Sequence, residues 1–483
     1  MSSGILFRYT VPPHCYDVER RWRLANCVIG CLLVSISMSP SFARSEDSSG
    51  SNETTILDRW ESFQATMNDH GVIFQTINTI DILSPVSGGV RRQAAIAGDL
   101  DLLLTLDGAQ LLDWPDATLF VYGLGVYGDD PSQNVGDLQA VSSIAAPNSW
   151  KLYEFWYQQN FLQERFSLLA GLYDVTSEFD VIRSSSELFL NSSFGTGPEF
   201  ATSGVNGPST FPTTTLAVRG QAILSDELVI RTVVADGVPG NPEDPGGTQL
   251  ILRKQDGVFI NTELAFYNLR DQRRRDARKI IRKRPLRLVF QRVGRAAPME
   301  YEGKYAIGLW GYTTDLSDLS EVDPSGNPLK RDATGGIYGL AEQIVFHETE
   351  DREQGLTLFA RAGLSDPRVN RLSRYYGAGL VYRGLIPGRD ADEIGLGVGA
   401  AFNGSHFKRA QQKAEIPVDN AEITVEMSYT INVREEIVVQ PDLQYIMNPG
   451  TDPAVRNALV VGVRLELNLN WFEGPTTSVE ILK

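Results

Sequence analysis

The sequence is poor in cysteine, in histidine and in long apolar runs. No stretch approaches the roughly 18 to 20 continuous apolar residues that a membrane-spanning helix needs, which excludes a helical membrane protein. The 483 residues carry 44 basic and 60 acidic side chains, a formal net charge of −16. Nucleic-acid partners require clustered Lys and Arg, so this balance argues against them. The chain is 42% apolar, which is too much for a disordered protein.

Residues 1–43 are predicted to be a signal peptide. A basic group lies ahead of the mostly apolar stretch 24–38, and Ser41-Phe42-Ala43 has the small-x-small pattern of a cleavage site. Residues 1–19 form an unusual upstream extension, which a later translation start would explain. The only cysteines all lie in this leader: Cys15, Cys27 and Cys31. The exported chain therefore takes no stability from disulfides and has 40 basic against 58 acidic residues, a balance of −18.

Residues 44–70 are predicted to form a flexible arm followed by a short helix. The arm, 44–55, is polar and rich in serine. The helix is indicated by apolar residues at helical spacing ahead of Gly71. These residues are Leu57, Trp60, Phe63 and Met67.

From residue 71 to residue 472 apolar and polar residues alternate with the period of two that is typical of β-strands. In 422–430 and 459–467 every second residue is apolar; in 99–106 Leu103 is the one apolar residue on the polar face. The other stretches are 72–81, 117–127, 151–159, 165–173, 213–223, 227–236, 258–267, 304–314, 335–347, 355–364, 374–384, 393–403 and 434–446. They predict about 16 strands, each near the length that crosses a bilayer when tilted.

The connections between these stretches alternate in length. The long ones are 82–93, 128–150, 174–212, 237–256, 315–334 and 404–419, and short ones include 225–226 and 431–433. Long loops at one end and short turns at the other favour an all-β, antiparallel transmembrane β-barrel over 71–472, with a short N-terminal helix and a C-terminal tail at 473–483. A soluble sandwich or propeller is the alternative, although no repeat of roughly 40 to 50 residues supports a propeller.

One insert, 270–295, has the opposite charge to the rest of the chain. It holds twelve basic and two acidic residues and falls on the short-turn side. It is predicted either to contact anionic lipid headgroups or another polyanion, or to be a solvated insertion of no special role.

Several segments resemble the carbohydrate-selective porin family of Gram-negative outer membranes, the OprB-type porins. They are 189–195 (FLNSSFG), 301–310 (YEGKYAIGLW), 355–363 (GLTLFARAG), 384–392 (GLIPGRDAD) and 440–450 (QPDLQYIMNPG). The resemblance implies a sixteen-stranded barrel in the outer membrane that passes sugars by passive diffusion and needs no cofactor. It also implies contact with outer-membrane lipids and the barrel-assembly machinery, and a possible homotrimer. The chain departs from the family in its basic insert and in ending beyond its last aromatic pair, Trp471-Phe472.

Polar side chains on the strand faces opposite the apolar ones are the predicted pore lining, because they can exchange for the hydration water of sugar hydroxyls. Trp156 is included because its ring could stack on a pyranose face. The candidates are Asp99, Asp101, Glu154, Trp156, Arg231, Glu263, Arg361, Glu422, Glu426, Gln440, Asp442, Gln444, Arg464 and Glu466. As a set they predict a polar, acidic lumen, which disfavours an anion channel.

The long connection 174–212 follows about the fifth strand, where porins commonly fold a loop inward. Mixed charge on such a loop would set selectivity at a constriction. The candidates are Glu178, Asp180, Arg183, Glu187 and Glu199. An external, solvent-exposed loop is the alternative.

No catalytic or metal-binding motif is evident in the exported chain. Its three histidines, His70, His347 and His406, lack metal-ligand spacing, and neither a Gly-x-Ser-x-Gly elbow nor a Walker A loop is present. The glycine-rich stretch 395–399 lies within a strand pattern, so side-chain crowding at the wall is the expected reason for it. The expected function is a carbohydrate porin; the alternatives are a general or cation-preferring porin, an outer-membrane barrel enzyme and a soluble sugar-binding protein.

Overall fold

A computed structural model describes residues 56–242, 244–269, 301–349, 351 and 353–472. The predicted leader, the arm up to residue 55, the basic insert 270–295 and the tail 473–483 lie outside these residues. The predicted short helix is α2 (Ile56–Asp69), in which the rings of Trp60 and Phe63 lie 5.7 Å apart. No helix in the described part of the chain is both long and apolar enough to cross a membrane.

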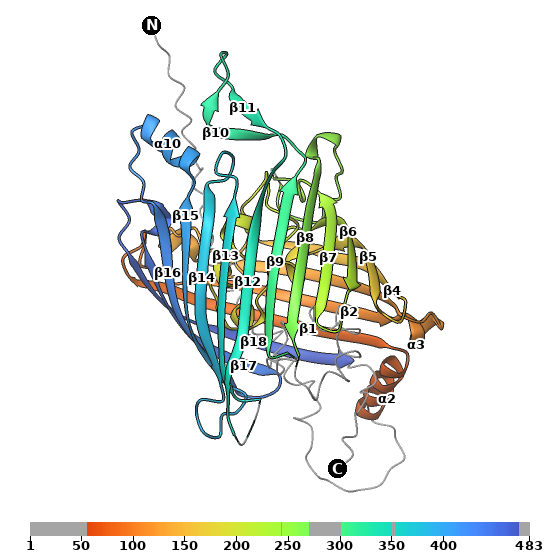
Figure 1. The fold of residues 1–483 in the computed structure, drawn as a ribbon. Helices are drawn as coiled ribbons and strands as arrows, with labels where there is room; N and C mark the ends of the chain where they lie inside the picture. The colour runs from red at the N-terminus through yellow and green to blue at the C-terminus, as the bar shows by residue number, and fades with distance from the viewer. Residues whose placement is uncertain (1–55, 243, 270–300, 350, 352, 473–483) are drawn as a thin grey trace. The chain divides into compact units, whose positions relative to one another are not determined.

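Sixteen antiparallel strands form one closed barrel (Figure 1). Each strand pairs with the next one in the barrel, and β1 closes the circle by pairing with β18. The strands are β1 (Val72–Ser87), β2 (Ala95–Asp107), β3 (Ala117–Gly128), β4 (Ser149–Phe161), β5 (Phe166–Tyr173), β6 (Thr215–Ile223), β7 (Leu228–Asp236), β8 (Val258–Asn268), β9 (Gly303–Tyr312), β12 (Thr334–His347), β13 (Gly355–Ser365), β14 (Leu372–Arg383), β15 (Glu393–Asn403), β16 (Ala421–Asn432), β17 (Ile437–Met447) and β18 (Ala458–Phe472). The predicted sixteen-stranded barrel is confirmed.

Short elements occupy the connections. A two-stranded sheet of β10 (Leu316–Val322) and β11 (Pro328–Arg331) lies between β9 and β12, and α10 (Ser405–Lys413) lies between β15 and β16; Figure 1 shows both at the same end of the barrel. The remaining short helices are α3 (Gly108–Leu112), α4 (Ser132–Val135), η2 (Val175–Ser177), α5 (Arg183–Leu188), α6 (Ser192–Gly195), α7 (Pro198–Ala201), η3 (Lys254–Asp256) and η5 (Pro449–Thr451).

The first connection is shorter than the sequence predicted. Strand β1 continues to Ser87, so half of the expected loop 82–93 belongs to the strand. The pattern misleads there because Pro85 normally interrupts a strand. Strand β8 ends at Asn268 and β9 begins at Gly303, so the insert 270–295 belongs to the connection between them, outside the described residues.

Exposed and buried residues alternate along the strands, so each strand has an outer and an inner face, as expected for a barrel wall. Along β9 the exposed residues are Tyr305, Ile307 and Leu309, and the buried ones are Lys304, Ala306 and Trp310. The buried face points to the lumen, and it is less uniformly polar than predicted. An apolar cluster lies inside, and it includes Leu103, Phe120, Trp156, Phe194 and Phe200. The sequence expectation of a polar lumen is therefore wrong for this part, because residues of a connecting segment pack against the wall there.

Candidate functional site

The connection 174–214 folds into the barrel. Its apolar residues Phe179, Phe194 and Phe200 are fully buried, and they belong to the same cluster as wall residues. Ring contacts join them to the wall: Phe200 lies 5.4 Å from Trp310, and Phe189 lies 5.7 Å from Phe359. We call residues 174–214 the inward segment. The alternative of an external loop does not fit this packing.

Glycines on one stretch of the wall make room for the inward segment. A Cβ atom at Gly397 would lie 2.7 Å from Cε1 of Phe194, and one at Gly395 would overlap Leu188. Contacts this short are below ordinary van der Waals distance. The predicted reason for the glycine-rich stretch 395–399, crowding at the wall, is thus confirmed.

A buried ion pair fastens the middle of the inward segment. Arg361 on β13 lies 2.6 Å from Oδ1 of Asp180 and also donates to the Asp180 backbone carbonyl at 2.8 Å. Asp180 Oδ2 accepts the backbone N–H of Gly197 at 2.9 Å. Glu199 lies close by, and burial together with the Asp180 charge raises the pKa of Glu199 to about 8. The group thus links Asp180, the start of α7 and the wall strand β13.

The other predicted constriction residues also have partners. Glu178 lies 2.7 Å from Arg219 on β6, and Arg183 lies 3.0 Å from Glu187 within α5. Burial raises the pKa of Glu187 to about 7 although Arg183 opposes the shift. Burial would also raise the pKa of Glu178, but the charges of Arg219 and Arg231 and the hydrogen bonds that Glu178 accepts together lower it. All five predicted constriction residues therefore belong to the inward segment and lie in one region.

The predicted pore-lining residues all lie on the buried faces of their strands. Twelve are buried and two, Arg464 and Glu466, are partly buried. Several contact the connections that fill the lumen: Glu154 accepts the Asp174 N–H at 2.8 Å, and Gln444 donates to the Val141 carbonyl at 2.9 Å. Contact of any of them with a sugar stays a prediction.

Trp156 does not present an open face. Its side chain is 1% exposed, and its ring centroid lies 4.9 Å from that of Phe120. The suggested stacking of Trp156 on a pyranose ring therefore does not fit this structure, because a neighbouring aromatic ring occupies that position.

The sequence reading missed several charged residues of the lumen, including four that have a clear place on the inner wall. Each lies on a buried strand face: Asp81, Arg219, Lys304 and Glu342. Arg464 lies 2.7 Å from Asp81, and Lys304 donates to the Val181 carbonyl at 2.7 Å. Their period-two position would have identified them, as it identified Arg361.

A second connection, 129–148, also reaches into the lumen. Leu138 and Gln139 donate their N–H groups to the Glu422 carboxylate on β16, at 2.8 and 2.9 Å. Ser142 donates to Asp81 at 2.7 Å, and the Ser143 N–H donates to the carbonyl of Leu190 in the inward segment. The sequence predicted this connection only as a long loop. Two connections together therefore occupy the lumen.

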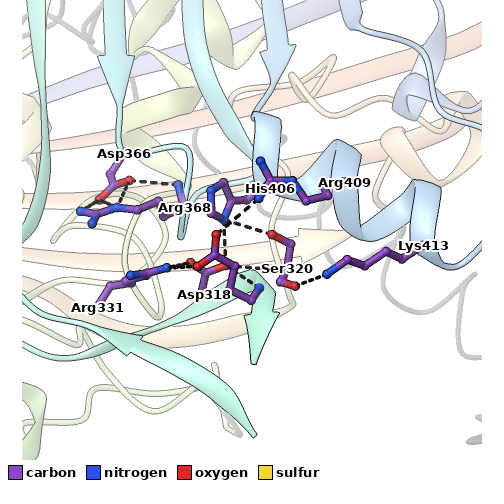
Figure 2. A network of polar contacts seen from close by, with 9 residues as sticks. Asp318, Ser320, Arg331, Asp366, Arg368, His406, Arg409 and Lys413 are labelled. Carbon is purple, nitrogen blue, oxygen red and sulfur yellow. Dashed lines mark hydrogen bonds and ion pairs between the residues drawn. The ribbon is translucent and has the colours of Figure 1, made fainter. Parts of the chain in front are cut away.

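A polar network at the long-loop end of the barrel contains an aspartate, a histidine and a serine (Figure 2). Its geometry bears on the alternative that the protein is a barrel enzyme. Asp318 on β10 lies between Arg331 on β11 and His406 on α10. Ser320 Oγ and Asp318 Oδ1 lie 3.1 and 2.8 Å from the same atom, Nδ1 of His406. A catalytic relay needs the serine and the carboxylate on opposite ring nitrogens, so this arrangement is not one.

The other two histidines lie elsewhere and have partners of their own. His347 Nε2 lies 2.7 Å from Glu302, and His70 Nδ1 lies 2.7 Å from the Thr66 carbonyl. Within the described ranges, no three His, Cys, Asp or Glu side chains are grouped so that they could hold a metal ion.

Comparison with known proteins agrees with this architecture. The family model described as "Carbohydrate-selective porin, OprB family" matches residues 91–469. Porin B of Pseudomonas aeruginosa is 22% identical over 479 residues, which is 93% of this chain and 99% of the relative. The putative porin QuiX of Acinetobacter baylyi is 18% identical over 439 residues, 86% of this chain and 92% of the relative.

A solved structure shows the same fold. The high-pH structure of Pseudomonas putida OprB matches with a TM-score of 0.72 at 19% identity, covering 88% of this chain and all of the other. The predicted function, a carbohydrate porin, is confirmed at the level of the family. The chain belongs to the carbohydrate-selective porin family.

Proposed function

We propose that this porin lets mono- or oligosaccharides diffuse passively through a lumen that its inward segment narrows. The observation that carries the proposal is the inward segment itself, which is held against the inner wall of a closed barrel by the Arg361–Asp180 pair. A segment held against the wall in this way narrows the path of the solute through the lumen but does not close it. The concentration gradient supplies the driving force, and no cofactor takes part.

The charges of the lumen favour a neutral solute. Six basic side chains of the inner wall and inward segment lie beside acids: Arg183, Arg219, Arg231, Arg361, Arg464 and Lys304. An anion-selective pore would instead present unpaired basic groups to the solute. The lumen also holds carboxylates outside these pairs, and these would favour cations. A cation-preferring porin is therefore the second candidate.

We place the protein in the outer membrane of a Gram-negative bacterium, in contact with its lipids, inserted by the barrel-assembly machinery and able to associate as a homotrimer. Exposed apolar residues on the outer wall, such as Ile307 and Leu309, support contact with lipid. Cell fractionation tests the location: release into the periplasm without detergent would contradict it.

Planar-bilayer recording of the full-length protein tests the function. Added maltose or glucose should reduce the channel current in a concentration-dependent way. A polyethylene glycol of similar size is the control, because it enters by size alone. Equal effects of sugar and polymer would remove the sugar claim, and a strongly cation-selective reversal potential in KCl gradients would favour the second candidate.

A further inference from the structure

Five glutamates of the barrel wall accept hydrogen bonds from backbone N–H groups of the two connections inside the lumen. They lie on β4, β8, β12 and β16, and all are buried: Glu154, Glu263, Glu342, Glu422 and Glu426. All five side chains thus point to the main chain of a connection rather than to one of its charged side chains.

Glu342 holds the start of α5. Its two carboxylate oxygens accept the N–H groups of Arg183 at 3.3 Å and Ser184 at 3.0 Å, and Tyr301 donates its hydroxyl at 2.5 Å. The first N–H groups of a helix have no partner within the helix, so the wall carboxylate satisfies them. The orientation of α5 in the lumen is therefore fixed from the wall.

Glu426 and Glu422 act in the same way on neighbouring parts. Glu426 accepts the N–H groups of Leu190 at 2.6 Å and Asn191 at 3.1 Å, in the turn between α5 and α6. Glu422 accepts those of Leu138 and Gln139 in the second connection, and also that of Gly450 at 2.7 Å. One strand, β16, thereby holds both connections.

Glu263 and Glu154 hold the beginning of the inward segment. The Asp180 N–H donates to Glu263 at 3.1 Å, and the Asp174 N–H donates to Glu154 at 2.8 Å. Glu263 also accepts the Tyr338 hydroxyl at 2.8 Å and lies 3.7 Å from Arg231 and 3.8 Å from Lys304. Its carboxylate is thus surrounded by protein groups.

We propose that these five glutamates are positioning residues, which set the width of the sugar path by holding the two connections. Four of them, all except Glu342, are predicted pore-lining residues, but all five have carboxyl oxygens that already accept backbone amides. A hydrogen bond is electrostatically stronger in the protein interior than in water, so these buried contacts hold the connections firmly. The inference rests on the proposed function only in taking the connections to border the sugar path.

Hydrogen–deuterium exchange of the full-length protein in detergent tests this role segment by segment. The variants are Glu342→Gln, Glu422→Gln and Glu426→Gln, in which an amide NH2 replaces one accepting oxygen. Exchange should rise about 10- to 100-fold only where each carboxylate binds. Those segments are 183–188, 137–143 and 189–191 respectively.

Glu393→Gln is the matched control. Glu393 lies on the same wall, on β15, and pairs with Arg383 at 3.4 Å; no described backbone amide of the two connections donates to it. The substitution Glu393→Gln makes the same carboxyl-to-amide change, but it removes no hydrogen bond to a backbone N–H group of the two connections. Bilayer recordings should show more open-channel noise in the three test variants than in this control.

Two results would overturn the inference. One is exchange in the three segments that equals that of Glu393→Gln. The other is a rise that extends equally through the wall strands, which would indicate a general loss of stability. Sugar block of the wild-type channel decides the proposed function separately, because the exchange measurement needs no sugar.

Discussion

Removal of the Arg361 guanidinium should release the centre of the inward segment while leaving the barrel intact. Arg361 is buried, and its loss leaves the Asp180 carboxylate without its cation. Breaking a buried ion pair from one side costs about 3 to 5 kcal/mol. Since each 1.4 kcal/mol corresponds to a factor of ten, the undocked population of residues 178–200 should rise about 100- to 5000-fold in Arg361→Ala.

Hydrogen–deuterium exchange of peptides that cover 178–200 measures this change directly. Arg361→Lys should lie between wild type and Arg361→Ala, because it keeps the charge but cannot reach Asp180 and the Phe194 carbonyl together. Arg374→Ala is the control, since Arg374 lies on the outer face of β14, 5.2 Å from the Phe402 ring. An increase below tenfold in Arg361→Ala, or one matched by Arg374→Ala, would refute the argument.

Three further predictions follow from the lumen. Gly397→Val should push Phe194 away from the wall and lower single-channel conductance, whereas Gly220→Val, where an added Cβ meets no atom within 4 Å, should not; equal conductance in both variants would contradict the packing. The raised pKa of Glu199, about 8, means that its docked form prefers the proton. Protonated Glu199 therefore stabilises the docked position of the inward segment. This contribution is fully present below the ordinary pKa of a glutamate and is lost as the pH rises through 8. Open-channel noise should thus increase between pH 6 and 9 in wild type and stay constant in Glu199→Gln; parallel pH profiles would exclude this role. Trp156→Phe should change the glucose block constant less than about twofold because the ring is buried against Phe120, and a tenfold weaker block would restore the stacking hypothesis.

The barrel could be predicted from the sequence because a two-residue period is a local property. Each strand shows its lipid face by itself, so the pattern locates all sixteen strands. The same pattern places Gly397 within a strand, which is enough to predict crowding at the wall. The end of β1 was missed because Pro85 resembles a loop signal, whereas β18 still pairs with that part of the strand.

The arrangement of the lumen could not be predicted in the same way. Whether the connection after β5 turns inward depends on contacts with residues more than a hundred positions away, such as Asp180 with Arg361. Period two placed Glu422 and Glu426 on the inner face, but it could not show that loop amides occupy their oxygens. Leu103 appeared to interrupt a polar face because its apolar neighbours come from other strands and from the inward segment.

The contacts of Glu342 and Glu426 have a consequence for how such a channel can change its solute. Both glutamates bind main-chain N–H groups, which every residue except proline provides. A change of side chain at 183, 184, 190 or 191 therefore leaves these backbone hydrogen bonds to the wall available, provided that none becomes proline. The wall glutamates thus hold the loop through its backbone, so a change of loop sequence can alter the solute preference while the loop keeps its position.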